Sequence, residues 1–153
     1  MQFNFFWIKY DDSRWFFRYI RQYIDEIIIP PATDEQKARI GDLAKSCQQL
    51  SEQRYVLEQQ LQRRFADFGI KKLNQKLERW WLLDFQAFQT ELKKSYKVEI
   101  ALKQRADWED YFNDACEKHA KFNQDIARLE NELNAAVYEL FGLSGEEVGL
   151  VGG

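Results

Sequence analysis

Residues 106–141, ADWEDYFNDACEKHAKFNQDIARLENELNAAVYELF, carry the pattern that decides the fold. Mostly apolar residues recur along this stretch in alternating steps of four and three. They are Trp108, Phe112, Ala115, His119, Phe122, Ile126, Leu129, Leu133, Ala136 and Leu140. A heptad pattern held over more than four repeats predicts one long helix whose apolar seam packs on another helix, as in a coiled coil. Gly142 stands where a left-handed residue would end that helix.

A second heptad seam begins after a double proline. Thr33 and Gln36 have the spacing of a capping box, so we expect a helix to start there. The seam then runs through Ile40, Leu43, Cys47, Leu50, Arg54, Leu57 and Leu61. A helix over residues 34–66 would be about 50 Å long at 1.5 Å per residue. Because each helix alone would expose a long apolar stripe, we predict that the two pair within the chain.

Residues 67–105 join the two predicted helices. Gly69 is expected to end the first helix, and a helical pattern resumes over residues 71–95. Its apolar stripe consists of Leu73, Leu77, Trp80, Trp81, Phe85 and Phe88. We expect a turn at residues 95–97, followed by a short helical or extended piece over residues 98–103. This basic connection is predicted to cover the helix pair.

Residues 1–33 have a different composition from the rest of the chain. Residues 1–32 hold ten of the 24 aromatic residues, and β-branched and aromatic residues predict one or two short strands here. Pro30 and Pro31 end this segment in an extended conformation. The predicted fold class is therefore mainly α, with long paired, coiled-coil-like helices and a small β element at the N-terminus.

The net charge of −3 conceals a strong asymmetry along the chain. Residues 67–105 contain nine Lys and Arg against five Asp and Glu, whereas residues 106–153 contain three against eleven. A basic cluster favours contact with phosphates, although lysines also commonly form a solvated surface. The DNA-binding candidates are Arg14, Arg18, Arg21, Lys71, Lys72, Lys93, Lys94 and Lys97. Trp80 and Trp81 could stack on bases, but their spacing favours a place in the core.

Catalytic and metal sites have no pattern to support them. His119 is the only histidine, and its place on the seam favours a structural role beside Arg54 or a carboxylate. Cys47 and Cys116 have neither metal-ligand spacing nor a disulfide framework, so we expect buried thiols in a reducing compartment. No apolar run has the length of a membrane span, and the N-terminus lacks signal-peptide features. We expect a cytoplasmic protein with no membrane partner.

Several strings resemble the C-terminal region of adenine-N6 DNA methyltransferases from restriction–modification systems, including fused type II enzymes. RYIRQYIDEIIIPP (residues 18–31) followed by DEQ (34–36) is similar to the junction between a target-recognition domain and a spacer helix. LNAAVYELFGLSGEEV (133–148) resembles the tail of that family, and WLLDFQAFQTELKK (81–94) with WEDYF (108–112) resembles the region between. The catalytic Asn-Pro-Pro-Tyr-type motif and the glycine-bearing S-adenosylmethionine loop are absent, so the resemblance assigns no catalytic or cofactor residue to this chain.

The resemblance implies a non-catalytic segment of such an enzyme. Residues 1–33 would be the trailing edge of a target-recognition domain, 34–66 a spacer helix, 67–105 a basic connection, and 106–153 a long helix with a tail. The implied partners are double-stranded DNA and an upstream methyltransferase domain, which would bind S-adenosylmethionine. The alternative is a coiled-coil module that docks another protein through its acidic last helix.

Overall fold

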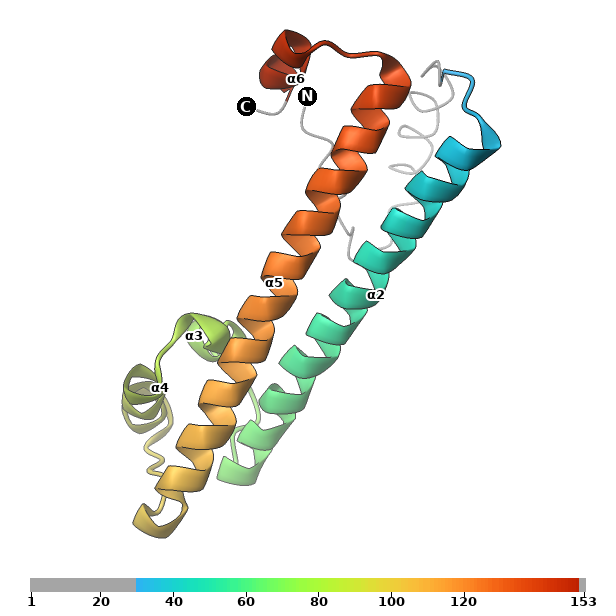
Figure 1. The fold of residues 1–153 in the computed structure, drawn as a ribbon. Coiled ribbons are helices and arrows are strands. Elements are labelled where there is room, and N and C mark those ends of the chain that lie inside the picture. The colour runs from blue at the N-terminus through green and yellow to red at the C-terminus, as the bar shows by residue number, and fades with distance from the viewer. Residues whose placement is uncertain (1–29, 152–153) are drawn as a thin grey trace, which may run out of the picture. The chain divides into compact units, whose positions relative to one another are not determined.

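The computed structural model describes residues 30–151 of the 153-residue chain, and in this part of the chain every regular element is helical. The two long helices are α2 (Asp34–Arg64) and α5 (Arg105–Phe141) (Figure 1). The shorter elements are η1 (Phe65–Phe68), α3 (Gln75–Glu78), η2 (Trp80–Leu82), α4 (Phe85–Glu91), η3 (Leu92–Tyr96), η4 (Leu102–Gln104) and α6 (Gly145–Val151). The mainly α class is therefore confirmed, whereas the predicted strands of residues 1–33 fall almost wholly on residues 1–29, outside the described part.

The described part of the chain divides into two compact units, residues 30–41 with 133–151 and residues 42–132. In the first unit, Thr33 and Gln36 form the predicted capping box. The Thr33 amide donates to Gln36 Oε1 (2.9 Å) and the Gln36 amide donates to Thr33 Oγ1 (3.2 Å). An exposed ion pair links α2 to α5 between Arg39 and Glu139 (3.4 Å). Gly142 ends α5 with a φ of 63°, as its position predicts.

In the second unit, α2 and α5 lie side by side and run antiparallel (Figure 1). Arg54 bonds to Asn123, and one turn later Glu58 bonds to His119, so positions rise along α2 as they fall along α5. The predicted seam is the buried side of both helices. The seam residues of α2 in this unit are all buried or half-buried. On α5, the seam residues with at most 6% exposure are Phe112, Ala115, His119 and Ile126.

The helical pattern predicted over residues 71–95 is divided into several short helices. Asn74 and Asp84 each adopt an extended conformation and accept a hydrogen bond from a backbone amide three residues later, Asn74 from Leu77 and Asp84 from Ala87. Each therefore starts a new helix, and the segment becomes α3, a 3₁₀ turn, α4 and a π-helical turn. Residues 98–101 belong to no helix. The long helix before this segment ends at Arg64 and continues as the 3₁₀ turn η1, not as α-helix to residue 66.

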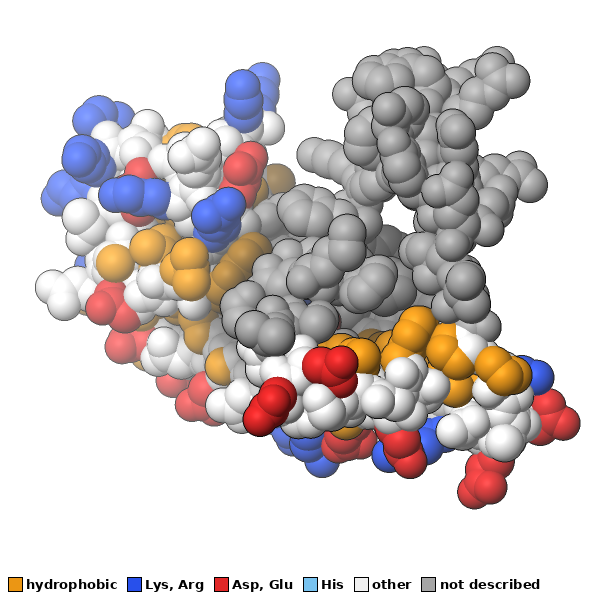
Figure 2. All heavy atoms as spheres, turned by 90° about the horizontal axis from the view of Figure 1, so that it is seen from above, with side chains coloured by type: hydrophobic (Ala, Val, Ile, Leu, Met, Phe, Trp, Pro, Cys, Tyr) orange, Lys and Arg blue, Asp and Glu red, His pale blue; other side chains and the backbone are white. Residues whose placement is uncertain are grey.

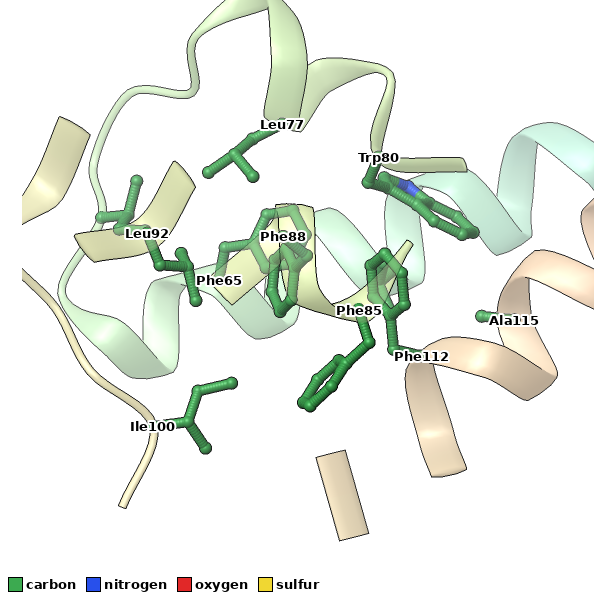
Figure 3. Close-up of a cluster of buried hydrophobic side chains, with 11 residues drawn as sticks. Phe65, Leu77, Trp80, Phe85, Phe88, Leu92, Ile100, Phe112 and Ala115 are labelled. Atoms are coloured by element: carbon green, nitrogen blue, oxygen red, sulfur yellow. The ribbon is translucent and has the colours of Figure 1, made fainter. Parts of the chain in front are cut away.

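The short elements from η1 to η3 are held to the helix pair by one apolar cluster (Figure 3). Phe88 of α4 stacks on Phe112 of α5, with ring centroids 4.6 Å apart and an interplanar angle of 18°. Trp80 meets Phe112 edge-on at 6.0 Å, and Phe65 approaches Phe88 at 5.4 Å. The remaining buried members are Leu61, Ile70, Leu77, Phe85, Leu92, Ile100 and Ala115. The stripe predicted between Leu73 and Phe88 is thus buried or half-buried although it does not lie on one continuous helix.

We expect Phe112→Ala to lower the free energy of unfolding by about 3–5 kcal/mol, because it removes a fully buried ring at the centre of this cluster. Urea denaturation followed by circular dichroism measures the loss. Tyr111→Ala is the matched control, since Tyr111 precedes Phe112 on α5 and is 40% exposed. Equal losses in the two variants would contradict the placement of the core.

Candidate nucleic-acid interface

The candidate lysines of residues 71–97 are all exposed, and we call this segment the basic head. Figure 2 shows Lys and Arg side chains gathered over the part of the molecule formed by α3 and α4. The head contains the five candidates Lys71, Lys72, Lys93, Lys94 and Lys97, together with Lys76 and Arg79. The other three candidates, Arg14, Arg18 and Arg21, lie outside the described residues.

A polar network around the buried Glu91 joins the two lysine groups of the head. Asn74 stands between them: its Oδ1 caps α3, and its Nδ2 donates to Glu91 Oε1 (2.7 Å) and to Ser95 Oγ (3.3 Å). Ser95 Oγ also donates to Glu91 Oε1 (2.5 Å). Lys76 Nζ lies 3.3 Å from the other oxygen of the same carboxylate. Segments 71–76 and 91–97 are therefore fixed to each other by side chains that sequence analysis did not single out.

Tyr96 completes this network at the backbone of the first segment. Its phenol oxygen accepts from the Asn74 amide (2.7 Å) and donates to the Lys72 carbonyl (3.1 Å). We call Asn74, Glu91, Ser95 and Tyr96 the polar clasp. The clasp thus ties the backbone of Lys72 to the side chain of the residue before Lys97.

The pKa of Glu91 lies below its ordinary value. The hydrogen bond from Ser95 is the main cause; burial opposes it, and Asn74 and Lys76 add to the lowering. Glu91 is only 7% exposed, so its charge needs these partners. Lys93 forms a second ion pair with the exposed Glu99 at 2.6 Å and lowers the pKa of that carboxyl.

Most of the head's positive charge has no carboxylate beside it. Within residues 30–151, Lys76 and Lys93 form ion pairs, whereas Lys71, Lys72, Lys94 and Lys97 have no carboxylate oxygen within 4.0 Å. These four exposed lysines lie on one segment of the chain without a carboxylate partner. An anion beside them would be attracted by their positive charge.

Lys97 has a backbone conformation that favours glycine. Its φ of 59° and ψ of 29° are left-handed, and among the described residues it is the only non-glycine with a positive φ. This conformation costs an L-residue roughly 1–2 kcal/mol. The turn predicted at residues 95–97 is thus confirmed, and it ends the π-helical turn η3.

The tryptophans belong to the core and do not face a ligand. Trp80 is fully buried, and its Nε1 has no hydrogen-bond partner among the described residues. Trp81 is half-buried and stacks on His119, with ring centroids 4.5 Å apart and an interplanar angle of 15°. Base stacking by Trp80 would require the head to leave the helix pair.

His119 has the structural role expected from its place on the seam. Arg54 donates to Asn123 Oδ1 (2.7 Å), which turns the Asn123 amide nitrogen toward His119 Nδ1 (3.3 Å). Nε2 is hydrogen-bonded to Glu58 Oε1 (2.9 Å), so both ring nitrogens have a partner. With 3% exposure, His119 fixes the register of α2 and α5 from inside the seam.

The cysteines are free and half-buried. Burial raises the pKa of Cys116 to about 11, and burial together with Glu130 and Glu132 raises the pKa of Cys47. Both thiols therefore stay protonated at neutral pH and are poor nucleophiles. Within residues 30–151 no cluster of His, Cys, Asp and Glu could hold a metal ion, and no helix is long and apolar enough to cross a membrane.

Residues 33–137 match the family described as "Domain of unknown function (DUF8810)". The chain belongs to this family. The matched region starts at the capping Thr33 and includes α2, the basic head and most of α5. No curated protein and no solved structure matches the chain.

Acid should weaken the clasp of this DUF8810 protein. The Glu91 pKa is lower in the folded chain than its ordinary value, so the ionised carboxylate stabilises the fold. This stabilisation is fully present above the ordinary Glu pKa of about 4.3 and is lost as the pH falls through the lowered pKa of the folded chain. We expect Glu91→Gln to reduce the free energy of unfolding at pH 7 by about 1 kcal/mol. Between pH 5 and pH 3, the free energy of unfolding of the variant should fall by less than that of the wild type. Thermal unfolding across this pH range measures both effects.

The control for this experiment is Glu109→Gln, which changes an exposed carboxylate on α5. The free energy of unfolding of this variant should match that of the wild type at every pH. The same acid dependence in Glu91→Gln as in the wild type would show that the clasp carboxylate does not contribute.

Proposed function

We propose that this chain is a non-catalytic helical spacer whose basic head contacts the phosphates of double-stranded DNA. The observation that carries the proposal is the polar clasp, which brings two separate lysine groups to one exposed surface. Lysines contact phosphates as point charges and read no bases, so the contact would position DNA without reading its sequence.

The anchoring of the head supports a positioning role. The head packs on α2 and α5 through the aromatic cluster around Phe112, and the α2–α5 register is set by His119, Glu58 and Asn123. A charge-bearing surface built on packed helices holds its geometry better than one built on a free loop. The head would thus present its charges in a fixed arrangement.

We place this spacer in the C-terminal, target-recognition part of a DNA adenine-N6 methyltransferase of a restriction–modification system. The support is the resemblance of residues 18–36, 81–94, 108–112 and 133–148 to that family. In this role residues 1–33 belong to the trailing edge of the recognition domain and supply Arg14, Arg18 and Arg21. An upstream domain binds S-adenosylmethionine and carries the catalysis, and the protein acts in the cytoplasm.

The alternative, a coiled-coil docking module, needs an apolar seam that is free for a partner. In residues 42–132 the seam of α5 instead faces α2 and the aromatic residues of the head. In these residues the apolar seam is thus covered by other parts of the same chain. This favours the spacer over the docking module.

The spacer role predicts that the chain binds a 30-base-pair duplex at low salt, without sequence preference, and that its affinity falls steeply as salt rises. Replacing Lys71, Lys72, Lys93 and Lys94 with serine should weaken binding at least tenfold at 50 mM salt. The slope of log K against log salt should fall by about 0.9 for each phosphate that the variant no longer neutralises. Fluorescence anisotropy with two unrelated duplexes measures both quantities.

Lys118→Ser with Lys121→Ser on α5 is the control, because these exposed lysines lie outside the head. This double variant should bind nearly as the wild type does. No binding by the wild type at 50 mM salt, or an equally large weakening in the control, would contradict a DNA-contacting head.

The internal pairing of the seam predicts a monomer. Sedimentation velocity at concentrations on the order of 5 to 200 μM, where a weak dimer would form, should give one species with the mass of a single chain. A mass that doubles with concentration would favour the docking module, because the seam would then be shared between chains.

A further inference from the structure

Lysine at position 97 is not explained by the local backbone. The described chain has three left-handed positions, and glycine fills the other two, Gly69 and Gly142. These glycines end helical segments in the same way as Lys97 ends η3. Glycine at 97 would adopt the same conformation without the steric cost of a side chain.

The contacts of Lys97 also do not require a lysine. Its backbone amide donates to the Lys93 carbonyl (3.2 Å), and the next amide, of Val98, donates to the Leu92 carbonyl (3.3 Å). These two bonds close the turn and would form with any residue. The side chain adds one exposed bond from Nζ to the Lys94 carbonyl (3.1 Å), and such a bond in water contributes little.

The surroundings of Lys97 favour an anion. The Tyr96 phenol bonds to the Lys72 carbonyl and the Asn74 amide, so the residue next to Lys97 is tied to the backbone of the Lys71–Lys72 segment. No carboxylate oxygen of residues 30–151 lies within 4.0 Å of these three ammonium groups. The backbone amides at the turn are already bonded, so an anion here would be held by side-chain ammonium groups.

We propose that Lys97 is a direct phosphate-contacting residue, kept in a left-handed conformation because its charge serves binding. This inference rests on the proposed function. The ligand is the phosphodiester backbone of duplex DNA, and Lys71 and Lys72 approach the same stretch of backbone. Tyr96 is the positioning residue, because its hydroxyl holds the two segments together without carrying charge.

The test compares Lys97→Gly with Lys103→Ser in the full chain. Each variant removes one exposed positive charge, but Lys103 lies in η4, outside the head. Lys97→Gly should melt at or above the wild-type temperature, bind a 30-base-pair duplex at least threefold more weakly at 50 mM salt, and show a salt slope smaller by about 1. Lys103→Ser should weaken binding less than twofold.

Two further variants separate charge from conformation. Lys97→Arg should keep most of the affinity, and Lys97→Asn, which tolerates the left-handed conformation, should bind as weakly as Lys97→Gly. Tyr96→Phe should weaken binding without any change in net charge.

Failure of this inference is distinguishable from failure of the proposed function. Binding by the wild type together with equal binding by Lys97→Gly and Lys103→Ser overturns the role of Lys97 alone. Lower melting temperatures in both Lys97→Gly and Lys97→Asn overturn it as well, because the lysine then serves the turn. Absence of wild-type binding overturns both proposals.

Discussion

The stack of Phe88 on Phe112 is the contact on which the basic head depends. The head consists of pieces such as α3, with four residues, and α4, with seven. Helices this short are not stable alone in water, because nucleation costs more than a few hydrogen bonds return. Burial of Leu77, Trp80 and Phe88 against the helix pair supplies the missing free energy. The lysines hold their positions only because these apolar neighbours hold the backbone.

The polar clasp adds specificity to this apolar packing. An apolar cluster alone permits small shifts of one short helix on another, because hydrophobic contact is not directional. Glu91 removes that freedom, since its buried carboxylate must keep its bonds to Asn74, Ser95 and Lys76. A shift of either segment would leave a charge buried without partners. The clasp thus sets the spacing between lysines that the apolar cluster can only bring near one another.

Sequence periodicity predicted the two long helices and their seam because a heptad repeat has one simple solution, a helix with one apolar side. The same reasoning did not divide residues 71–95 into their short helices. Leu77, Trp80, Phe85 and Phe88 are buried as expected, but short pieces can bury residues at helical spacing as well as one helix can. Asn74 and Asp84 are residue types that start helices, and reading them as caps would have divided the segment correctly. The clasp itself could not be read from the sequence, because the bonds that join its two segments connect residues 17 to 24 positions apart and only the packing of the head brings them together.

The charge asymmetry of the chain limits how DNA could approach it in the proposed role. The first half of α5 carries exposed carboxylates at Glu109, Asp110, Asp114 and Glu117, and Lys118 neutralises only Asp114 (2.7 Å). Charges interact over about 10 Å at 0.1 M salt, so a duplex lying along this face would be repelled. A duplex that meets the exposed lysines at 71, 72 and 97 avoids that cost only if the outer face of α5 points away from it. The acidic helix would then orient the DNA by excluding it from one side, which lysines acting as point charges cannot do alone.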